Sequence, residues 1–376
     1  MATAIHENAM KDQNAAQILA CVMKWQDEDV QRYVPNLQLL AEHKYDHYQR
    51  FEPGRRFIES LAIWLRQFDE ADRDVAFQFV ASKLIFISDT EFSHLVQSTY
   101  PDLIVQERMR LVADESAIDP HLVAKIACRP RFTELRLKSL YLGLSDGART
   151  NELRRAAKGE ISNEQIWQAY ELGETKAADM LKELGNALKA ANLPSENQRF
   201  NLIWLLDDFS GSGNTYIRFD VNAKCFKGKI PKIYARLAQG DLVDPSHYEV
   251  FLVLYTATRQ SINHIEYWAE RFTAEAGHKP LQVRVINVLE PETAITCNTD
   301  TALVALLDHP DYYDNCASDK HTKVGGTSDV RRGFAACALP LVLSHNTPNN
   351  SIYLLLGSDN YHFKGLFPRV SRHLES

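Results

Sequence analysis

Long apolar runs are missing from this chain of 376 residues. The longest ones, residues 337–343 and 251–255, fall far short of the roughly 20 residues that a bilayer-spanning helix needs. Residues 1–14 are polar and contain no apolar stretch, so they do not resemble a secretory signal. We therefore expect a soluble, cytoplasmic protein without a membrane partner.

The chain also lacks an excess of basic residues and closely spaced cysteine pairs. The chain has 42 Lys and Arg against 49 Asp and Glu, a net charge of −7. That balance disfavours binding of nucleic acid or anionic membranes by the whole surface, although a local basic patch is compatible with it. The six cysteines are scattered and form no CxxC pair, which favours reduced thiols over a disulfide or zinc framework.

Two regions differ in the periodicity of their apolar residues. Up to about residue 130 the apolar residues follow the 3.6-residue period of amphipathic helices. The helices expected there cover residues 57–68, 73–82 and 89–97. The basic, proline-interrupted segment 126–138 reads as a junction. We therefore predict a helical N-terminal region over 1–130, a docking or gating element without a catalytic residue, and an α/β domain over 131–376.

The second region alternates short apolar runs with amphipathic stretches. The expected strands cover residues 137–142, 202–206, 250–255, 283–288, 339–344 and 351–356. The expected helices cover residues 164–170, 175–190, 229–239, 259–272 and 301–307. Strands that are apolar almost throughout, separated by helices, predict a mainly parallel sheet flanked by helices. Ligands of such sheets bind beyond the carboxyl ends of the strands, so functional residues are expected in the loops that follow them.

The most informative segment is residues 201–219. An apolar strand leads into two adjacent acids, Asp207 and Asp208, and small residues follow at 210–215 before what looks like a helix start. Glycines let several backbone N–H groups point inward, and a helix N-terminus adds positive partial charge, so such a loop can cradle a phosphate. The carboxylates can accept hydrogen bonds from sugar hydroxyls or hold Mg²⁺ through water. This combination suits a ribose that carries a 5′-phosphate.

Three familiar motifs are excluded by the residues of this loop. A P-loop requires a lysine after its last glycine, and none follows Gly213. A nucleophile elbow requires glycine two positions before its serine, but Ser210 precedes Ser212. Tyr216 stands where a dinucleotide-binding fingerprint has its third glycine. A βα turn without a function remains the alternative.

The segment resembles the phosphoribosyl diphosphate (PRPP) binding motif of type I phosphoribosyltransferases. Four apolar residues precede two acids and a small-residue loop that ends in Gly-x-Thr. The resemblance implies that Asp207 and Asp208 are the catalytic and metal-binding acids, that they face the ribose 2′- and 3′-hydroxyls, and that the cofactor is Mg²⁺. It implies that the 5′-phosphate is held by Ser210, Gly211, Ser212, Gly213, Asn214 and Thr215. Gly211 departs from the motif, which more often has threonine there.

Two further segments extend the resemblance. Residues 139–150 read as a strand and a glycine-containing turn, about as far upstream of the acids as the pyrophosphate loop of type I phosphoribosyltransferases. The residues expected to contact a diphosphate there are Ser145, Asp146, Gly147 and Arg149. Residues 343–357 end a strand in an Asn- and Pro-rich turn, where further candidates for ligand binding are His345, Asn346 and Asn349. Taken alone, each segment also reads as an ordinary turn.

With an FPR sequence at 367–369 and the helical segment 53–68, these motifs resemble a divergent group. These are the phosphoribosyltransferase-like proteins of bacterial conflict systems, some of them associated with retron anti-phage defence. The resemblance covers roughly residues 45–373. It implies a defence effector whose partners include other components of such a system, among them a reverse transcriptase and its RNA–DNA product. Residues 151–200 depart from housekeeping relatives, because they predict helix where a second strand and a mobile loop are usual.

The resemblance implies a Mg²⁺-dependent pentosyltransferase that binds PRPP or another nucleotide containing ribose 5-phosphate. The alternative is a catalytically silent sensor or regulatory subunit that binds the same ligand. A structural scaffold, in which the loop after Asp208 is idle, is the third hypothesis.

Overall fold

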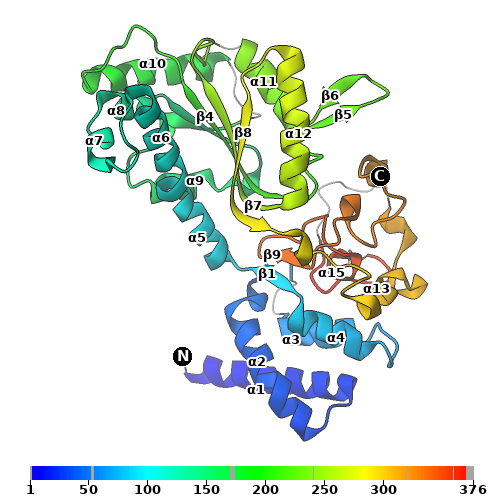
Figure 1. The fold of residues 1–376 in the computed structure, drawn as a ribbon. Coiled ribbons are helices and arrows are strands. Elements are labelled where there is room, and N and C mark those ends of the chain that lie inside the picture. Colours follow the sequence, from blue (N-terminus) through cyan, green and yellow to red (C-terminus); the bar gives the residue numbers. More distant parts are fainter. Residues whose placement is uncertain are drawn as a thin grey trace. The chain divides into compact units, whose positions relative to one another are not determined.

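The computed structural model describes residues 2–51, 55–169, 174–239, 241–318, 320–358 and 360–369. The chain forms two compact units (Figure 1). One is continuous, Phe92–Leu289, and the other combines Met1–Glu91 with Glu290–Ser376. This division does not coincide with the expected boundary at residue 130. Helices between residues 92 and 137 pack on the sheet, and the C-terminal segment shares a core with the N-terminal helices.

The continuous unit is built on a five-stranded parallel sheet, which confirms the predicted α/β class. The strand order is β3–β2–β4–β7–β8, and every neighbouring pair is parallel. The strands are β2 (Ser139–Gly143), β3 (Ile166–Gln168), β4 (Leu202–Ser210), β7 (Glu249–Thr258) and β8 (Leu281–Leu289). The three central strands are buried almost throughout, because helices cover both faces of the sheet.

Helices form a layer on each face of this sheet, with α12 on the side opposite α5 and α6 (Figure 1). One face packs its aliphatic residues against α10 (Glu174–Ala190), α11 (Lys229–Gln239) and α12 (Arg259–Ala276). The other face meets α5 (Asp89–Thr99), α6 (Val105–Ser116) and α9 (Thr150–Ala156), with α7 (Val123–Ala127) and α8 (Pro130–Leu137) beyond. On that face Trp204 stacks on Phe251 with ring centroids 4.3 Å apart, and Tyr141 lies in the same row.

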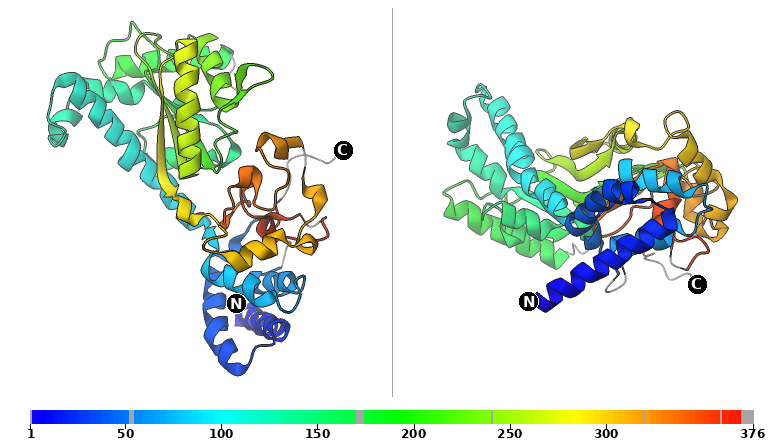
Figure 2. Two further views of the ribbon diagram at one scale, coloured as in Figure 1. Left: turned by 45° about the vertical axis from the view of Figure 1, so that its right-hand side comes forward. Right: turned by 90° about the horizontal axis from the view of Figure 1, so that it is seen from below.

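The discontinuous unit joins segments that lie far apart in the sequence. Its helices are α1 (Ala2–Met23), α2 (Asp27–His43), α3 (Phe57–Leu65), α4 (Arg73–Ser82), α13 (Thr301–Asp308), α14 (Lys320–Val324) and α15 (Tyr353–Leu356). Strand β1 (Ile85–Ile87) pairs in parallel with β9 (Leu341–Leu343). In both views of Figure 2, α13 runs beside α4. The indole of Trp64 donates to the carbonyl of Leu354 at 3.0 Å, so α3 and α15 share one core.

Four expected elements are corrected by the structure. Residues 351–356 were expected as a strand but contain the helix α15, because a short apolar run does not by itself distinguish strand from helix. The expected strand 339–344 is limited to β9 and pairs outside the five-stranded sheet. The junction 126–138 is largely helical, so β2 begins at Ser139 instead of residue 137.

The fourth correction concerns residues 164–170, which were expected as a helix. A short 3₁₀ turn, Asn163–Gln165, leads into the edge strand β3. The side-chain amide of Gln165 donates to three backbone carbonyls that include those of Arg136 and Ser139, and this ties the turn to the start of β2. A strand is therefore present where housekeeping relatives are expected to have their second strand.

None of the helices within the described residues is long and apolar enough to span a membrane.

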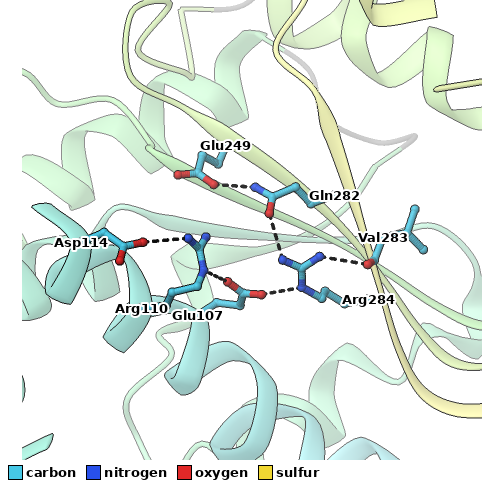
Figure 3. Close-up of polar contacts among 7 residues, drawn as sticks. All are labelled: Glu107, Arg110, Asp114, Glu249, Gln282, Val283 and Arg284. Carbon is cyan, nitrogen blue, oxygen red and sulfur yellow. Dashed lines mark hydrogen bonds and ion pairs between the residues drawn. The ribbon is translucent and has the colours of Figure 1, made fainter. Parts of the chain in front are cut away.

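A polar network fixes α6 to the edge of the sheet (Figure 3). Glu107 on α6 accepts hydrogen bonds from Arg110, at 2.8 Å, and from Arg284 on β8. Arg284 also donates to Gln282, and Gln282 donates to Glu249 on β7. Burial raises the pKa of Glu107, but the hydrogen bonds from Arg110 and Arg284 outweigh it and hold that pKa below its usual value.

We predict that Glu107→Gln lowers the free energy of unfolding by about 2 kcal/mol at pH 7, because two charge-assisted hydrogen bonds are lost. A carboxyl group with a lowered folded-state pKa stabilises the fold above its unfolded pKa, and this contribution is lost as the pH falls through the folded pKa. The difference between the two proteins should therefore shrink below about pH 4 in urea denaturation.

Glu115→Gln is the matched control for this prediction. Its partner is Arg131, and both side chains are more exposed than Glu107, at 45% and 31% against 12%. An exposed pair of this kind contributes less than about 1 kcal/mol. A Glu107→Gln effect that is no larger than the control, or that is unchanged at acidic pH, would contradict the assignment.

Candidate functional site

The register between β2 and β4 places two loops next to each other. Gly143 at the end of β2 pairs with Leu206 near the end of β4, and Leu144 donates one further bond to the Leu206 carbonyl at 2.9 Å. Strand β2 ends there, whereas β4 continues beside β7 to Ser210, so the turn that follows β2 lies beside the next residues of β4. The turn at 145–149 and the acids Asp207 and Asp208 therefore lie together.

Gly147 lies directly against the side chain of Asp208. A Cβ atom at this position would overlap the carboxylate of Asp208, so any side chain would displace that acid. Tyr255 on β7 also holds the turn, because its hydroxyl donates to the Ala148 carbonyl at 2.7 Å. Asp208 is itself partly exposed, and its Oδ1 accepts from the backbone N–H of Phe209 at 2.8 Å.

Asp207 is surrounded by donors of the protein itself. Its side chain is only 1% exposed. One oxygen, Oδ1, accepts from the hydroxyl of Ser145 and from the backbone N–H of Asp208 at 3.1 Å. The other, Oδ2, accepts from the hydroxyl of Tyr216 at 2.7 Å and from the ammonium of Lys229 at 2.6 Å. We refer to Ser145, Asp207, Tyr216 and Lys229 as the Asp207 cluster.

Electrostatics at Asp207 combine opposing influences. Burial and the neighbouring charge of Asp208 raise the pKa of Asp207 above its usual value, and Lys229 and the Ser145 hydroxyl offset only part of that rise. All four partners of the carboxylate are donors, which matches the hydrogen-bonding capacity of its ionised form. The geometry therefore fits an Asp207–Lys229 ion pair.

The loop 210–215 rests on the start of α12. The hydroxyls of Ser210 and Ser261 are hydrogen-bonded to each other, and the hydroxyl of Thr258 donates to the Gly211 carbonyl. Gly213 has a φ of +79°, and a Cβ atom there would lie 2.8 Å from Cδ2 of His264. Glycine is thus required both by the left-handed backbone and by the close approach of α12.

The expected helix start after this loop is corrected by the structure. The hairpin of β5 (Arg218–Asp220) and β6 (Cys225–Lys227) follows instead, and α11 begins only at Lys229. Two helix N-termini adjoin the loop: that of α11 at its far end, where Lys229 donates to the Thr215 carbonyl at 3.0 Å, and that of α12, which belongs to the next βα unit. The cap of α12 is Thr258, whose hydroxyl accepts from the backbone N–H of Ser261 at 3.0 Å. Positive partial charge therefore also reaches this loop from a helix that was not expected there.

The remaining residues of the 145–149 turn have distinct environments. Asp146 is exposed, and the Ser145 hydroxyl already donates to Asp207. Arg149 has a left-handed backbone with a φ of +44°, and its guanidinium lies 4.7 Å from the centroid of the Phe92 ring. It also donates to Glu152 at 3.4 Å. Arg149 is thus held at the start of α9, next to the turn.

Within the loop 210–215, exposure varies from residue to residue. Ser212 is buried, and its hydroxyl accepts from the backbone N–H of Asn214 at 3.4 Å. Asn214 is partly exposed and Thr215 is exposed. The carbonyl of Asn214 accepts from Arg218 at 3.0 Å, so the hairpin supports the far end of the loop.

The third group of candidates belongs to the other unit. His345, Asn346 and Asn349 lie in the turn after β9, within Glu290–Ser376. Their backbone carbonyls and amides have structural partners there. Arg50 donates to the His345 carbonyl at 3.0 Å, and Phe334 donates to the Asn349 carbonyl at 2.7 Å. These three residues therefore do not share a unit with the acids.

Sequence reasoning missed Lys229 and Tyr216 as members of the site. Lys229 lies 22 residues after Asp207, beyond a hairpin that the sequence did not reveal, and no motif connects the two positions. Tyr216 could have been noticed because it ends the small-residue loop, but nothing in the spacing shows that its hydroxyl turns back to Asp207.

A magnesium ion bound directly to Asp207 does not fit this donor set. Both carboxylate oxygens of Asp207 already accept two hydrogen bonds each, and one partner is a cation. Among the residues that the structure describes, no group of three or more His, Cys, Asp or Glu side chains could hold a metal ion.

The parallel sheet, the two adjoining loops and the acid pair define a phosphoribosyltransferase-like α/β protein. The family model PRTase-CE matches residues 61–369, which is most of the chain. The chain belongs to the PRTase-CE family. No curated protein and no solved structure matched the chain in the corresponding comparisons.

We predict that Gly147→Ala destabilises the protein by about 1–3 kcal/mol, because the new methyl group overlaps the Asp208 carboxylate. Removing that carboxylate as well, in Gly147→Ala/Asp208→Ala, should recover most of the loss. Thermal unfolding of the four proteins in this double-mutant cycle measures the coupling.

Gly185→Ala on α10 is the matched control, because a Cβ atom there meets only the flexible side chain of Gln198. Alanine also favours a helix over glycine by up to about 1 kcal/mol, so this variant should be neutral or stabilised. Equal losses in Gly147→Ala with and without Asp208 would disprove the contact.

Proposed function

We propose that the unit Phe92–Leu289 binds the ribose 5-phosphate part of PRPP or of a nucleotide, and that it acts as a pentosyltransferase. The observation that carries this proposal is the contact between the Gly147 turn and Asp208 beside the loop 210–215. A diphosphate, a ribose and a 5′-phosphate are linked in that order in PRPP. The two loops and the acid between them supply complementary groups in the same order.

Each part of the site has a role in this proposal. Backbone N–H groups and hydroxyls of the loop 210–215 hold the 5′-phosphate, aided by the N-terminus of α12. The turn 145–149 and the guanidinium of Arg149 receive the diphosphate. Asp208 accepts hydrogen bonds from the ribose hydroxyls. The loop and turn fix the two ends of the ligand, so the anomeric carbon between them is positioned for substitution.

The chemical step asks little covalent work of the protein. An acceptor nucleophile bonds to the anomeric carbon as the bond to the diphosphate breaks, so positive charge develops at that carbon and negative charge on the leaving diphosphate. Fixed donors in the 145–149 turn stabilise the latter, and positioning contributes the rest. Mg²⁺ that arrives with the diphosphate would neutralise further charge, and none of its ligands is assigned to Asp207.

The alternative function is a catalytically silent sensor or regulatory subunit that binds the same ligand. Nothing in the arrangement of Asp208 and the two loops requires turnover, because function is a property of the site and its acceptor and not of the fold. For either function we propose a cytoplasmic role in anti-phage defence, with other components of a defence system as partners. The support for that role is the resemblance of the motifs to conflict-system proteins.

Incubation with Mg²⁺ and either PRPP or a mixture of cellular nucleotides tests the proposal directly. Mass spectrometry should show loss of the ligand and release of diphosphate or nucleobase if the protein is a transferase. Binding without turnover would instead support the sensor. Absence of both binding and turnover would refute the proposed function and leave a structural role.

We predict that Asp208→Asn weakens the binding of ribose 5-phosphate by about tenfold to a hundredfold. Each charge-assisted hydrogen bond to a carboxylate contributes about 1.5–3 kcal/mol, and asparagine keeps the size of the side chain but not its charge. Inorganic phosphate should bind equally well or more tightly, since removal of a nearby carboxylate reduces repulsion. Isothermal titration calorimetry with both ligands measures the two effects.

Asp241→Asn is the control for charge alone. Its side chain is 86% exposed and pairs with Arg199, away from both loops. It should leave both affinities unchanged. Tighter binding of ribose 5-phosphate to Asp208→Asn would identify the loop as a simple anion site and would exclude the ribose contact.

A further inference from the structure

We infer that Lys229 is the resident cation of the acid pair and that Asp207 is a positioning residue, so that Asp208 alone faces the ligand. This differs from the expectation for Asp207 and Asp208, in which both acids bind the ribose hydroxyls and Mg²⁺. The part of the inference that concerns the ligand rests on the proposed function. The part that concerns Lys229 and Asp207 stands on the geometry of the site.

The first step is the capacity of the Asp207 carboxylate. An ionised carboxylate offers about four lone-pair positions on its two oxygens. Four donors occupy them, two on Oδ1 and two on Oδ2. With 1% of the side chain exposed, a ribose hydroxyl or a metal ion would have to displace a donor of the protein. Asp207 is therefore fully engaged inside the fold.

The second step is the position of Lys229. Its backbone N–H donates to the Thr215 carbonyl at 3.0 Å, at the end of the phosphate loop. Its ammonium reaches Asp207 at 2.6 Å, at the beginning of that loop, and lies 5.1 Å from the ring centroid of Tyr216. Lys229 thus holds both ends of the segment 207–215. Its side chain is only 17% exposed, so solvent screens this interaction weakly.

The third step is the connection to the diphosphate turn. Asp207 accepts a hydrogen bond from the hydroxyl of Ser145, while Asp208, the next residue, lies against Gly147. The ion pair with Lys229 fixes the position of Asp207. Through the Ser145 hydroxyl, Asp207 in turn fixes the position of the turn 145–149 relative to Asp208. The lysine charge also offsets the Asp207 carboxylate, and a compensated carboxylate attracts a divalent cation much less than an uncompensated one.

Titration of the protein with Mn²⁺ alone, followed by electron paramagnetic resonance, tests the cation assignment. The wild type should bind no Mn²⁺ at the acid pair at millimolar concentration. Lys229→Met should bind it roughly tenfold more tightly or better, because the Asp207 charge is then uncompensated. The gain should disappear in Lys229→Met/Asp208→Asn. Tight Mn²⁺ binding to the wild type that Asp208→Asn abolishes would overturn the inference.

Ribose 5-phosphate titrations test the roles of the two acids. Asp207→Asn/Lys229→Met removes the ion pair without leaving either charge unpaired, and its affinity should fall less than that of Asp208→Asn, because the acid that faces the ligand is kept. Asp207→Asn alone should bind more weakly, because Lys229 is left without its partner. If the paired variant loses as much affinity as Asp208→Asn at an unchanged melting temperature, Asp207 touches the ligand and the inference is wrong.

Lys229→Arg keeps the experiment decisive if the neutral variants do not fold. It retains the charge, so it should bind ribose 5-phosphate like the wild type and should gain no Mn²⁺ site. Gain of Mn²⁺ binding by this variant would contradict the inference. The Mn²⁺ measurements contain no sugar phosphate, so failure of every protein to bind ribose 5-phosphate would refute the proposed function and leave the role of Lys229 to be decided by Mn²⁺.

Discussion

The parallel pairing of β2 with β4 is the constraint on which the site depends. The pairing ends at the hydrogen bond between Leu144 and Leu206, so the turn 145–149 leaves the sheet beside Asp207 and Asp208, while β4 continues beside β7 to Ser210. Two contacts of the site depend on this pairing: the packing of Gly147 against Asp208, and the hydrogen bond from Ser145 to Asp207. A slip of one residue would turn Asp207 from its buried cluster towards the opposite face of the sheet, because neighbouring strand residues alternate between faces.

Burial divides the labour within the acid pair. The two residues are adjacent in sequence and identical in chemistry, yet one is enclosed by four donors and the other is partly exposed. Because a buried carboxylate needs hydrogen-bond partners, a lysine, a tyrosine and a serine side chain all donate to Asp207. In return the loop 210–215, the turn 145–149 and the start of α11 are all tied to the Asp207 carboxylate. A conventional acid motif has thereby become partly an architectural element.

Much of the sheet could be predicted from the sequence because its strands are continuous apolar runs. The segments 202–206 and 250–255 fit strands of a sheet covered on both faces, and both are central strands. The edge strand β3 could not be found, since it is short and half-exposed, and a side chain, Gln165, holds its start. The acids and glycines of the candidate site could be picked out from the sequence, because they form short local patterns. Lys229 was not, because its role follows from a hairpin that returns the chain to Asp207.

The discontinuous unit has a consequence for the order in which the chain is assembled. Strand β1 must wait for β9, because Ile85 pairs with Leu341, and Trp64 waits for Leu354. During synthesis from the N-terminus, the unit Phe92–Leu289 is complete before either partner emerges, so it folds first as a unit. The parts of α3 and α4 that pack against the C-terminal segment stay uncovered throughout that interval. A ribosome that stalls between residues 289 and 341 would therefore release a chain with a folded sheet and an exposed apolar surface on its N-terminal helices. Chaperones bind nascent chains of this kind.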